Sequence, residues 1–395
     1  MDASQAPAPP LWIWQQPAWP AFVHQDAALA ALLRQCQQAQ GQLSALAGVL
    51  PEDGRQALDT LLQNIVTSSA IEGENLNVGS VRSSLARRLG IPDAAEPAPH
   101  SARAEGVAEL MLDATGDVGK PLDLPRLLHW HALLFAGHDG LLPLRIRIGQ
   151  LRGDEPMQVV SGRIDRPTVH FQAPPRQGLD EQLQHFLAWF AASSDDPALD
   201  PLLRAGIAHF WFVTLHPFDD GNGRLTRAIT DLALAQAAPG IARLYAMSAS
   251  ILDDRKGYYR ILEASQRGGL DISAWLHWFL QTLLHSLQQA LARIQRVIDK
   301  VRFWQLHAQQ ALSVEQAQVL NRLLDGGERG FANGINASQY QAVAKVSKAT
   351  ATRHLTDLLD KGCLRRLPGG GRSTRYQINL PGHAGNAIPS GDGSQ

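Results

Sequence analysis

The residues from His216 to Arg227, which read HPFDDGNGRLTR, combine side chains suited to the chemistry of phosphates. Histidine is the side chain whose ordinary pKa best suits the removal of a hydroxyl proton near neutral pH, so His216 is a candidate general base. Asp220 supplies hard oxygen atoms, and Mg²⁺ usually bridges one or two carboxylates and the phosphates of a substrate. We therefore expect Asp220 to be a ligand of Mg²⁺.

The loop Gly221, Asn222 and Gly223 suits a bound anion. Glycines let main-chain N–H groups converge, and the N-terminus of the helix expected to follow adds a partial positive charge. Arg224 and Arg227 are spaced i, i+3 on the first turn of that helix. Two forked guanidinium groups on one face suit the oxygens of a polyphosphate or of a carboxylate.

Each of these features also has a purely structural explanation. A histidine at the end of a helix usually packs or caps, and Gly-Asn-Gly commonly forms a turn. A base, a metal ligand, an anion loop and a cationic pair nevertheless occur together within residues 216–227. This clustering favours phosphate chemistry over the structural explanation.

The segments around this stretch are predicted to be mostly helical. Residues 202–215 are apolar nearly all round and indicate a buried helix, which Pro217 must end because proline cannot continue the hydrogen-bond ladder. Residues 179–190 place apolar side chains at helical spacing on one face. Residues 163–175 are rich in β-branched and aromatic side chains between prolines, which predicts a short β-hairpin.

The stretch 216–227 has every fixed position of HPFx(D/E)GNGRxxR, the signature of the Fic (Fido) family, and the chain therefore resembles that family. The resemblance implies a mostly α fold with a Fic-type helical core and a short β-hairpin flap. It also implies a protein adenylyltransferase, which transfers AMP from ATP, with Mg²⁺, to a Ser, Thr or Tyr hydroxyl of a protein, including the chain itself.

The resemblance assigns a role to each motif residue. His216 would deprotonate the target hydroxyl, Asp220 would hold Mg²⁺, residues 221–223 would hold the α- and β-phosphates, and Arg224 would bind the β- and γ-phosphates. The hairpin 163–175 would hold a segment of the target protein by β-augmentation.

A pair of tyrosines, Tyr258 and Tyr259, lies where the family places aromatic side chains near the adenine and the ribose. A tyrosine pair is also typical of core packing. Both interpretations stay open from the sequence.

A second motif lies upstream, where Ser68, Glu72 and Gly73 match the inhibitory signature (S/T)xxxE(G/N) of the same family. On a helix over about 62–73, Ser68 and Glu72 would share one face. The resemblance implies that the Glu72 carboxylate occupies Arg227 and repels the γ-phosphate of ATP. The alternative is a solvated surface glutamate.

The C-terminal part is predicted to be a winged helix-turn-helix, because helices alternate there with a turn and then a glycine-tipped hairpin. The expected helices and strands cover 313–325, 338–345, 348–361, 363–367 and 373–378. Within residues 336–378, eight Lys or Arg oppose two Asp, a local charge of 8 − 2 = +6. This charge favours DNA binding, and protein interaction is the alternative.

The two termini, 1–10 and 381–395, are predicted to be disordered. Between them we predict a helical region with the inhibitory helix (11–110), the catalytic core (111–295) and the winged helix (296–380). The alternative function is a nucleotide-sensing transcription regulator, or an antitoxin-like DNA-binding protein, that uses the winged helix.

The whole chain of 395 residues carries a net charge of −1, which gives no global attraction to nucleic acid or membrane. Its two cysteines have no metal-ligand spacing, and no signal-peptide pattern or run of ~18 apolar residues occurs. We expect a cytoplasmic protein without a membrane partner, and the sequence leaves a homodimer open.

Overall fold

The computed structural model describes residues 12–48, 54–92, 98–137, 146–163, 166–326, 331, 333–368 and 374–380. The segments predicted to be disordered, 1–10 and 381–395, lie outside the described residues. The chain divides into two compact units, Met1–Leu291 and Ala292–Gln395. No described helix combines the length and the apolar character that crossing a membrane requires.

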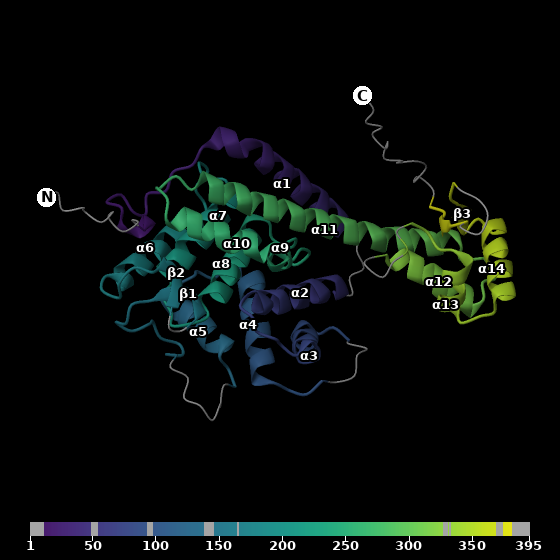
Figure 1. The fold of residues 1–395 in the computed structure, drawn as a ribbon, viewed down its shortest axis with the longest axis horizontal. Coiled ribbons are helices and arrows are strands. Elements are labelled where there is room, and N and C mark those ends of the chain that lie inside the picture. The colour runs from purple at the N-terminus through teal and green to yellow at the C-terminus, as the bar shows by residue number, and fades with distance from the viewer. Residues whose placement is uncertain are drawn as a thin grey trace. The chain divides into compact units, whose positions relative to one another are not determined.

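The first unit is built mainly of helices (Figure 1). In chain order they are α1 (Asp26–Ala47), α2 (Arg55–Ile71), α3 (Val78–Leu89), α4 (Ala102–Gly116), α5 (Leu124–Leu134), α6 (Leu179–Ala192), α7 (Pro201–Leu215), α8 (Asn222–Ala237), α9 (Met247–Asp253), α10 (Arg255–Gln266) and the start of α11 (Ser273–Leu306). A short 3₁₀ helix (Ile13–Gln15) precedes them. This confirms the mostly helical fold expected from the sequence.

Helix α7 is the buried helix that the sequence predicted over 202–215. Every residue from Leu202 to Leu215 is buried, and α7 packs along α8. His216 ends the helix in the left-handed region, with φ 49°, and Pro217 follows. The expected apolar face of 179–190 is also confirmed, since all five apolar residues of that face are buried in α6. These helices place the ends of the 216–221 loop on a rigid core.

The hairpin consists of β1 (Gln158–Arg163) and β2 (Arg166–Gln172), which are antiparallel. The predicted range 163–175 was wrong at its start, because it contains β2 but only the last residue of β1. In β1 only Val159 and Val160 are β-branched, and Ser161 follows them. Two β-branched residues are too few to predict a strand from the sequence. The register shifts between Val159 and Val160, which marks a β-bulge.

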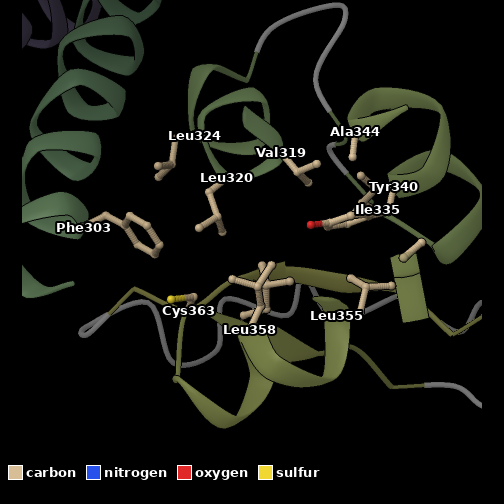
Figure 2. Packing of buried hydrophobic residues seen from close by; sticks show 12 residues of the cluster. Phe303, Val319, Leu320, Leu324, Ile335, Tyr340, Ala344, Leu355, Leu358 and Cys363 are labelled. Atoms are coloured by element: carbon tan, nitrogen blue, oxygen red, sulfur yellow. The ribbon is translucent and has the colours of Figure 1, made fainter. Parts of the chain in front are cut away.

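The second unit contains α12 (Val314–Asp325), α13 (Ala337–Ala344), α14 (Lys348–Asp360), and the antiparallel strands β3 (Leu364–Arg366) and β4 (Tyr376–Ile378). Its core is a cluster of buried side chains from α12, α13 and α14, together with Cys363 and with Phe303 of α11 (Figure 2). The elements follow the predicted order. The glycine tip, 369–371, lies outside the described residues, and the assignment to the winged-helix class stays a prediction.

Candidate active site

The loop that joins α7 to α8 forms one wall of a cavity of about 660 Å³ in the first unit. Most of the predicted site residues line this cavity: Glu72, His216, Asp220, Gly221, Asn222, Gly223, Tyr258 and Tyr259. Three predicted residues remain. Arg224 and Arg227 have side chains only 4% and 3% exposed, and each is paired with a glutamate, while Ser68 contacts Arg227. The structure therefore brings together the residues that the sequence singled out.

The imidazole of His216 has a defined proton position. Its Nδ1 lies 3.1 Å from the Val213 carbonyl oxygen, which can only accept, so Nδ1 carries the proton. In the neutral ring, Nε2 then keeps a free lone pair. Burial lowers the pKa of His216 below its ordinary value of 6.5, and the charge of Arg152 lowers it further. The ring is therefore neutral at pH 7 and can accept a proton at Nε2.

Arg152 fixes the main chain around the histidine. Its Nε donates to the His216 carbonyl oxygen at 2.8 Å, and its backbone N–H donates to the Pro217 carbonyl oxygen at 3.0 Å. A third donor, Nη2, reaches the Pro174 carbonyl oxygen just after the hairpin. Arg152 is 3% exposed. Its role was not predicted from the sequence, since nothing in the local sequence marks a contact with residues 64 positions away.

His131 holds the next part of the loop. The Gly149 N–H donates to Nδ1 at 2.9 Å, so Nε2 carries the proton and donates to the Asp220 carbonyl oxygen at 3.2 Å. The ring also stacks on Phe218, with centroids 4.2 Å apart and an interplanar angle of 11°. Burial lowers the pKa of His131. His131 was likewise not predicted, because it lies on α5, far away in the sequence.

The anion loop presents main chain rather than side chains to the cavity. The Asn222 side chain accepts from the Phe218 N–H at 3.0 Å and donates to the Phe218 carbonyl oxygen at 2.8 Å, so both of its polar ends are used inside the loop. Gly221 adopts φ 80°, which favours glycine. Helix α8 starts at Asn222, so its first N–H groups lack partners within the helix. Such an N-terminus suits a phosphate.

Asp220 fits the role of a magnesium ligand. Its side chain is 56% exposed, and Oδ1 accepts from the Gly221 N–H at 2.6 Å. Its other oxygen, Oδ2, lies 3.8 Å from Arg224 Nη2, which leaves it open to a cation. Mg²⁺ commonly uses a single carboxylate together with substrate phosphates and water. Among the described residues no group of three or more His, Cys, Asp or Glu forms a metal cage.

Ser68, Glu72 and Arg227 meet in the way the inhibitory motif implies. Glu72 Oε1 lies 2.9 Å from Arg227 Nη2, while Arg227 Nε donates to Ser68 Oγ and Nη2 to the Ser68 carbonyl oxygen, both at 2.8 Å. The predicted helix bounds, 62–73, were wrong at both ends, since α2 covers Arg55–Ile71 and Glu72 is its C-cap. Gly73 follows with φ 82° and turns the chain.

A second glutamate contacts the other motif arginine. Glu74 Oε2 lies 2.7 Å from Arg224 Nη1 and 2.6 Å from Arg103 Nη2 on α4. The turn at Gly73 allows both contacts, because it lets Glu72 and Glu74 reach different arginines. Neither Glu74 nor Arg103 was predicted from the sequence. The only local signal was an acidic residue two positions after Glu72.

Helix α2 is anchored to α8 and α9 by Asn64. Its amide donates to Asp231 Oδ2 on α8 at 2.8 Å, and its Oδ1 accepts from the Ser248 N–H on α9 at 3.1 Å. Burial raises the pKa of Asp231 to about 7. These buried polar contacts hold the helix that carries Ser68 and ends next to Glu72 in one position against α8.

The two tyrosines differ in their surroundings. Tyr258 is 2% exposed, and its hydroxyl lies 3.0 Å from His209 Nε2 in the core. Tyr259 is 38% exposed, and its hydroxyl lies 3.5 Å from Glu72 Oε2. Tyr258 thus packs as a core residue and lines the cavity with only part of its surface. Nucleotide binding by either tyrosine stays a prediction.

The chain is similar to known proteins over the region that contains this site. The model of the Fic/DOC family matches residues 121–234, which include the whole motif, and a domain of unknown function (DUF4172) matches residues 12–91. Protein adenylyltransferase Fic of Nematostella vectensis is 26% identical over 227 residues, which are 57% of this chain and 47% of that protein. Protein adenylyltransferase fic-1 of Caenorhabditis elegans is 23% identical over 251 residues, 62% of this chain and 44% of that protein.

These alignments span less than half the length of either relative. Among solved structures, a Fic family protein from Desulfovibrio desulfuricans G20 has a TM-score of 0.50 and 21% identity, and the match covers 93% of this chain and 97% of that chain. This likeness concerns the fold. Residues 121–234, which contain the motif, therefore form a Fic/DOC family domain.

Proposed function

We propose that the chain is a protein adenylyltransferase, which transfers AMP from ATP to a Ser, Thr or Tyr hydroxyl of a protein and is restrained by Glu72. The observation that carries this proposal is the free Nε2 of a neutral His216 in the same cavity as the anion loop. A base beside an anion site is what the deprotonation of a hydroxyl next to a phosphate requires.

Each part of the site has a task in this reaction. The main-chain N–H groups at the start of α8 hold phosphate oxygens, and His216 Nε2 removes the proton of the incoming hydroxyl. Asp220 would hold Mg²⁺, which offsets the negative charge of the phosphates. The edges of the β1–β2 hairpin, whose residues Val159 to Ser161 line the cavity, would pair with an extended segment of the target protein.

Two carboxylates restrain this reaction in our proposal. Glu72 occupies Arg227 and Glu74 occupies Arg224, so both guanidinium groups meant for phosphates are already paired. A Cβ at Gly223 would clash with Glu72 Oε1, so the Glu72 carboxylate lies against the first turn of α8, where a phosphate would bind. A phosphate there would meet both steric exclusion and charge repulsion.

Incubation of the full chain with labelled ATP and Mg²⁺ separates the enzyme from a nucleotide sensor. The Glu72→Gly variant should acquire covalent label, because its phosphate site is open. Bound but never covalent nucleotide, under the same conditions, would favour the nucleotide-sensing regulator instead.

The Glu74→Gln variant should bind ATP more tightly than the wild type. Glu74 is 27% exposed, and removing a partly solvated competitor worth ~1 kcal/mol should lower the dissociation constant roughly fivefold. AMP transfer should stay low, since Glu72 still holds Arg227. Calorimetric titration with ATP and Mg²⁺ measures the effect.

Glu109→Gln is the control, since Glu109 pairs with Arg88 at 2.9 Å and is not among the cavity residues. Equal affinities for Glu74→Gln and wild type would argue against a competing role for Glu74.

The second unit supports a second candidate function, the binding of duplex DNA through 336–378. On α14, Ala351, Leu355 and Leu358 face the core, while Lys348 and Arg353 are exposed. Exposed basic groups on a helix that follows a turn suit DNA phosphates and base edges.

We expect the full chain to bind duplex DNA at low salt and to lose affinity steeply as salt increases. Lys348→Ala and Arg353→Ala should each weaken binding and reduce the slope of log affinity against log salt by ~1 for each phosphate that the variant no longer neutralises. Fluorescence anisotropy over a salt series measures this, with Arg302→Ala on α11 as the control. If the chain does not bind duplex DNA even at the lowest salt concentration, the result favours the alternative, protein interaction.

A further inference from the structure

Ser161, His170 and Glu263 form a chain of hydrogen bonds in the wall of the same cavity. Ser161 Oγ on β1 lies 2.6 Å from His170 Nε2 on β2, and His170 Nδ1 lies 2.9 Å from Glu263 Oε2 on α10. None of the three belongs to the motif 216–227, and the proposed transfer to a partner protein uses the main-chain edge of the hairpin but none of these three side chains.

The direction of the proton follows from the partners. A carboxylate only accepts in this pair, so His170 Nδ1 donates to Glu263. Nε2 of the neutral ring is then the acceptor, and the Ser161 hydroxyl donates to it. A hydroxyl, an imidazole that accepts its proton and a carboxylate that orients the imidazole are the three parts of an activated nucleophile.

The β-bulge places His170 in this arrangement. Val159 pairs with Phe171, while Val160 pairs with Val169, so His170 is the extra residue of the bulge and has no cross-strand partner. A bulge turns its side chain away from the regular alternation. Here it turns His170 toward Glu263 on α10 as well as toward Ser161.

Arg267 fixes the carboxylate end of the chain. Its Nε lies 3.4 Å from Glu263 Oε1, and its Nη2 donates to the Val169 carbonyl oxygen at 2.9 Å. The hairpin, the carboxylate and α10 are thereby connected through one side chain. Ser161 itself is exposed toward the cavity that also contains His216 and the anion loop.

We infer that Ser161 is a site of self-modification that accepts AMP from an ATP bound in the cavity of the same molecule. This inference rests on the proposed adenylyltransferase function. The Ser161 O–H bond breaks and its proton moves to His170 Nε2, while Oγ forms a bond to the α-phosphorus. The bond from the α-phosphorus to the bridging oxygen of the β-phosphate breaks, and pyrophosphate leaves with the electron pair. The products are AMP–Ser161 and pyrophosphate, with the proton on a His170 paired with Glu263.

The test uses the full chain with Glu72→Gly, incubated with ATP and Mg²⁺ and mapped by peptide mass spectrometry. AMP should appear on the peptide that contains Ser161 and disappear from it in Ser161→Ala. His170→Gln should lower AMP on Ser161 by ~10²-fold relative to AMP at other positions, because the base is lost. The rate for each molecule should not change on dilution, since the reaction is intramolecular.

Ser194→Ala is the matched control. Ser194 is an exposed serine whose hydroxyl donates to the Ala191 carbonyl oxygen at 2.9 Å and has no basic partner there, so its loss should change nothing. AMP at other positions without AMP on Ser161 overturns the inference and leaves the proposed function intact. An equal fall at all positions in His170→Gln assigns the hydrogen-bond chain to bracing of the hairpin and also overturns it. Absence of AMP from the whole protein removes both proposals.

Discussion

In a Glu72→Gly background, the additional substitution His216→Ala should slow the transfer of AMP to hydroxyls other than Ser161 by roughly 10²–10⁴-fold. This is the usual effect of losing a general base. The reason is that Nε2 of His216 has a free lone pair at the anion loop and belongs to a ring whose ordinary pKa suits the removal of a hydroxyl proton. The difference is measured with labelled ATP. The label on the protein is counted after protein and free nucleotide have been separated.

ATP binding should survive in His216→Ala. The proposed phosphate site consists of main-chain N–H groups at the start of α8 and of the guanidinium groups of Arg224 and Arg227, none of which the substitution removes. A calorimetric titration that gives the same ATP affinity in both proteins separates lost chemistry from lost folding. Undiminished transfer by His216→Ala would remove the proposed mechanism.

The pH dependence of transfer provides a second test of the same residue. Because burial lowers the pKa of His216, the ring stays neutral, and competent as a base, to a pH below its ordinary value of 6.5. Transfer should therefore be at its plateau at pH 7 and decline on the acid side with a midpoint below about 6.5. An acid limb centred above that value would assign the titration to another group.

The motif residues could be predicted from the sequence because their chemistry is local. A base, a carboxylate and a glycine loop lie within one turn between two helices, so chain connectivity alone brings them together. The contact of Glu72 with Arg227 joins residues far apart in the chain, and only the resemblance to a family implied it. The structure places these two side chains in an ion pair.

The supporting residues could not be predicted, for the opposite reason. Arg152 and His131 act on main-chain carbonyl oxygens of residues 216 and 220, and any carbonyl is the same acceptor whatever its side chain. Glu74 is a polar residue in a turn, and the sequence alone predicts that such a residue is solvated. Its two arginine partners become known only from the structure. Asn222 was expected to hold phosphate as part of the anion loop, and this role of its main chain stays a prediction. The sequence did not indicate that its side chain would brace the loop.

The Glu72→Gly variant should transfer AMP about 10²-fold faster than the wild type, which should be nearly silent. In the wild type Arg227 is paired with Glu72, and the carboxylate lies against Gly223. We expect ATP to bind there only with its γ-phosphate displaced. A displaced nucleotide turns its α-phosphorus away from the incoming hydroxyl, and misplacement by about an ångström can cost ~10²-fold in rate. Glycine removes the carboxylate and frees Arg227 for the phosphate.

Three companion variants identify which property of Glu72 matters. Glu72→Gln keeps the volume at Gly223 but removes the charge, so it should fall between wild type and Glu72→Gly if both exclusion and repulsion contribute. Glu72→Asp should rise less than Glu72→Gly if the shorter side chain still reaches Arg227. Arg227→Ala loses the partner of the carboxylate and the phosphate clamp together, so it should stay inactive. Equal labelling of wild type and Glu72→Gly, at matched ATP and Mg²⁺, would show that the ion pair does not restrain the enzyme. That result would leave the assignment of His216 unaffected, since the base and the carboxylate act on different atoms of the reaction.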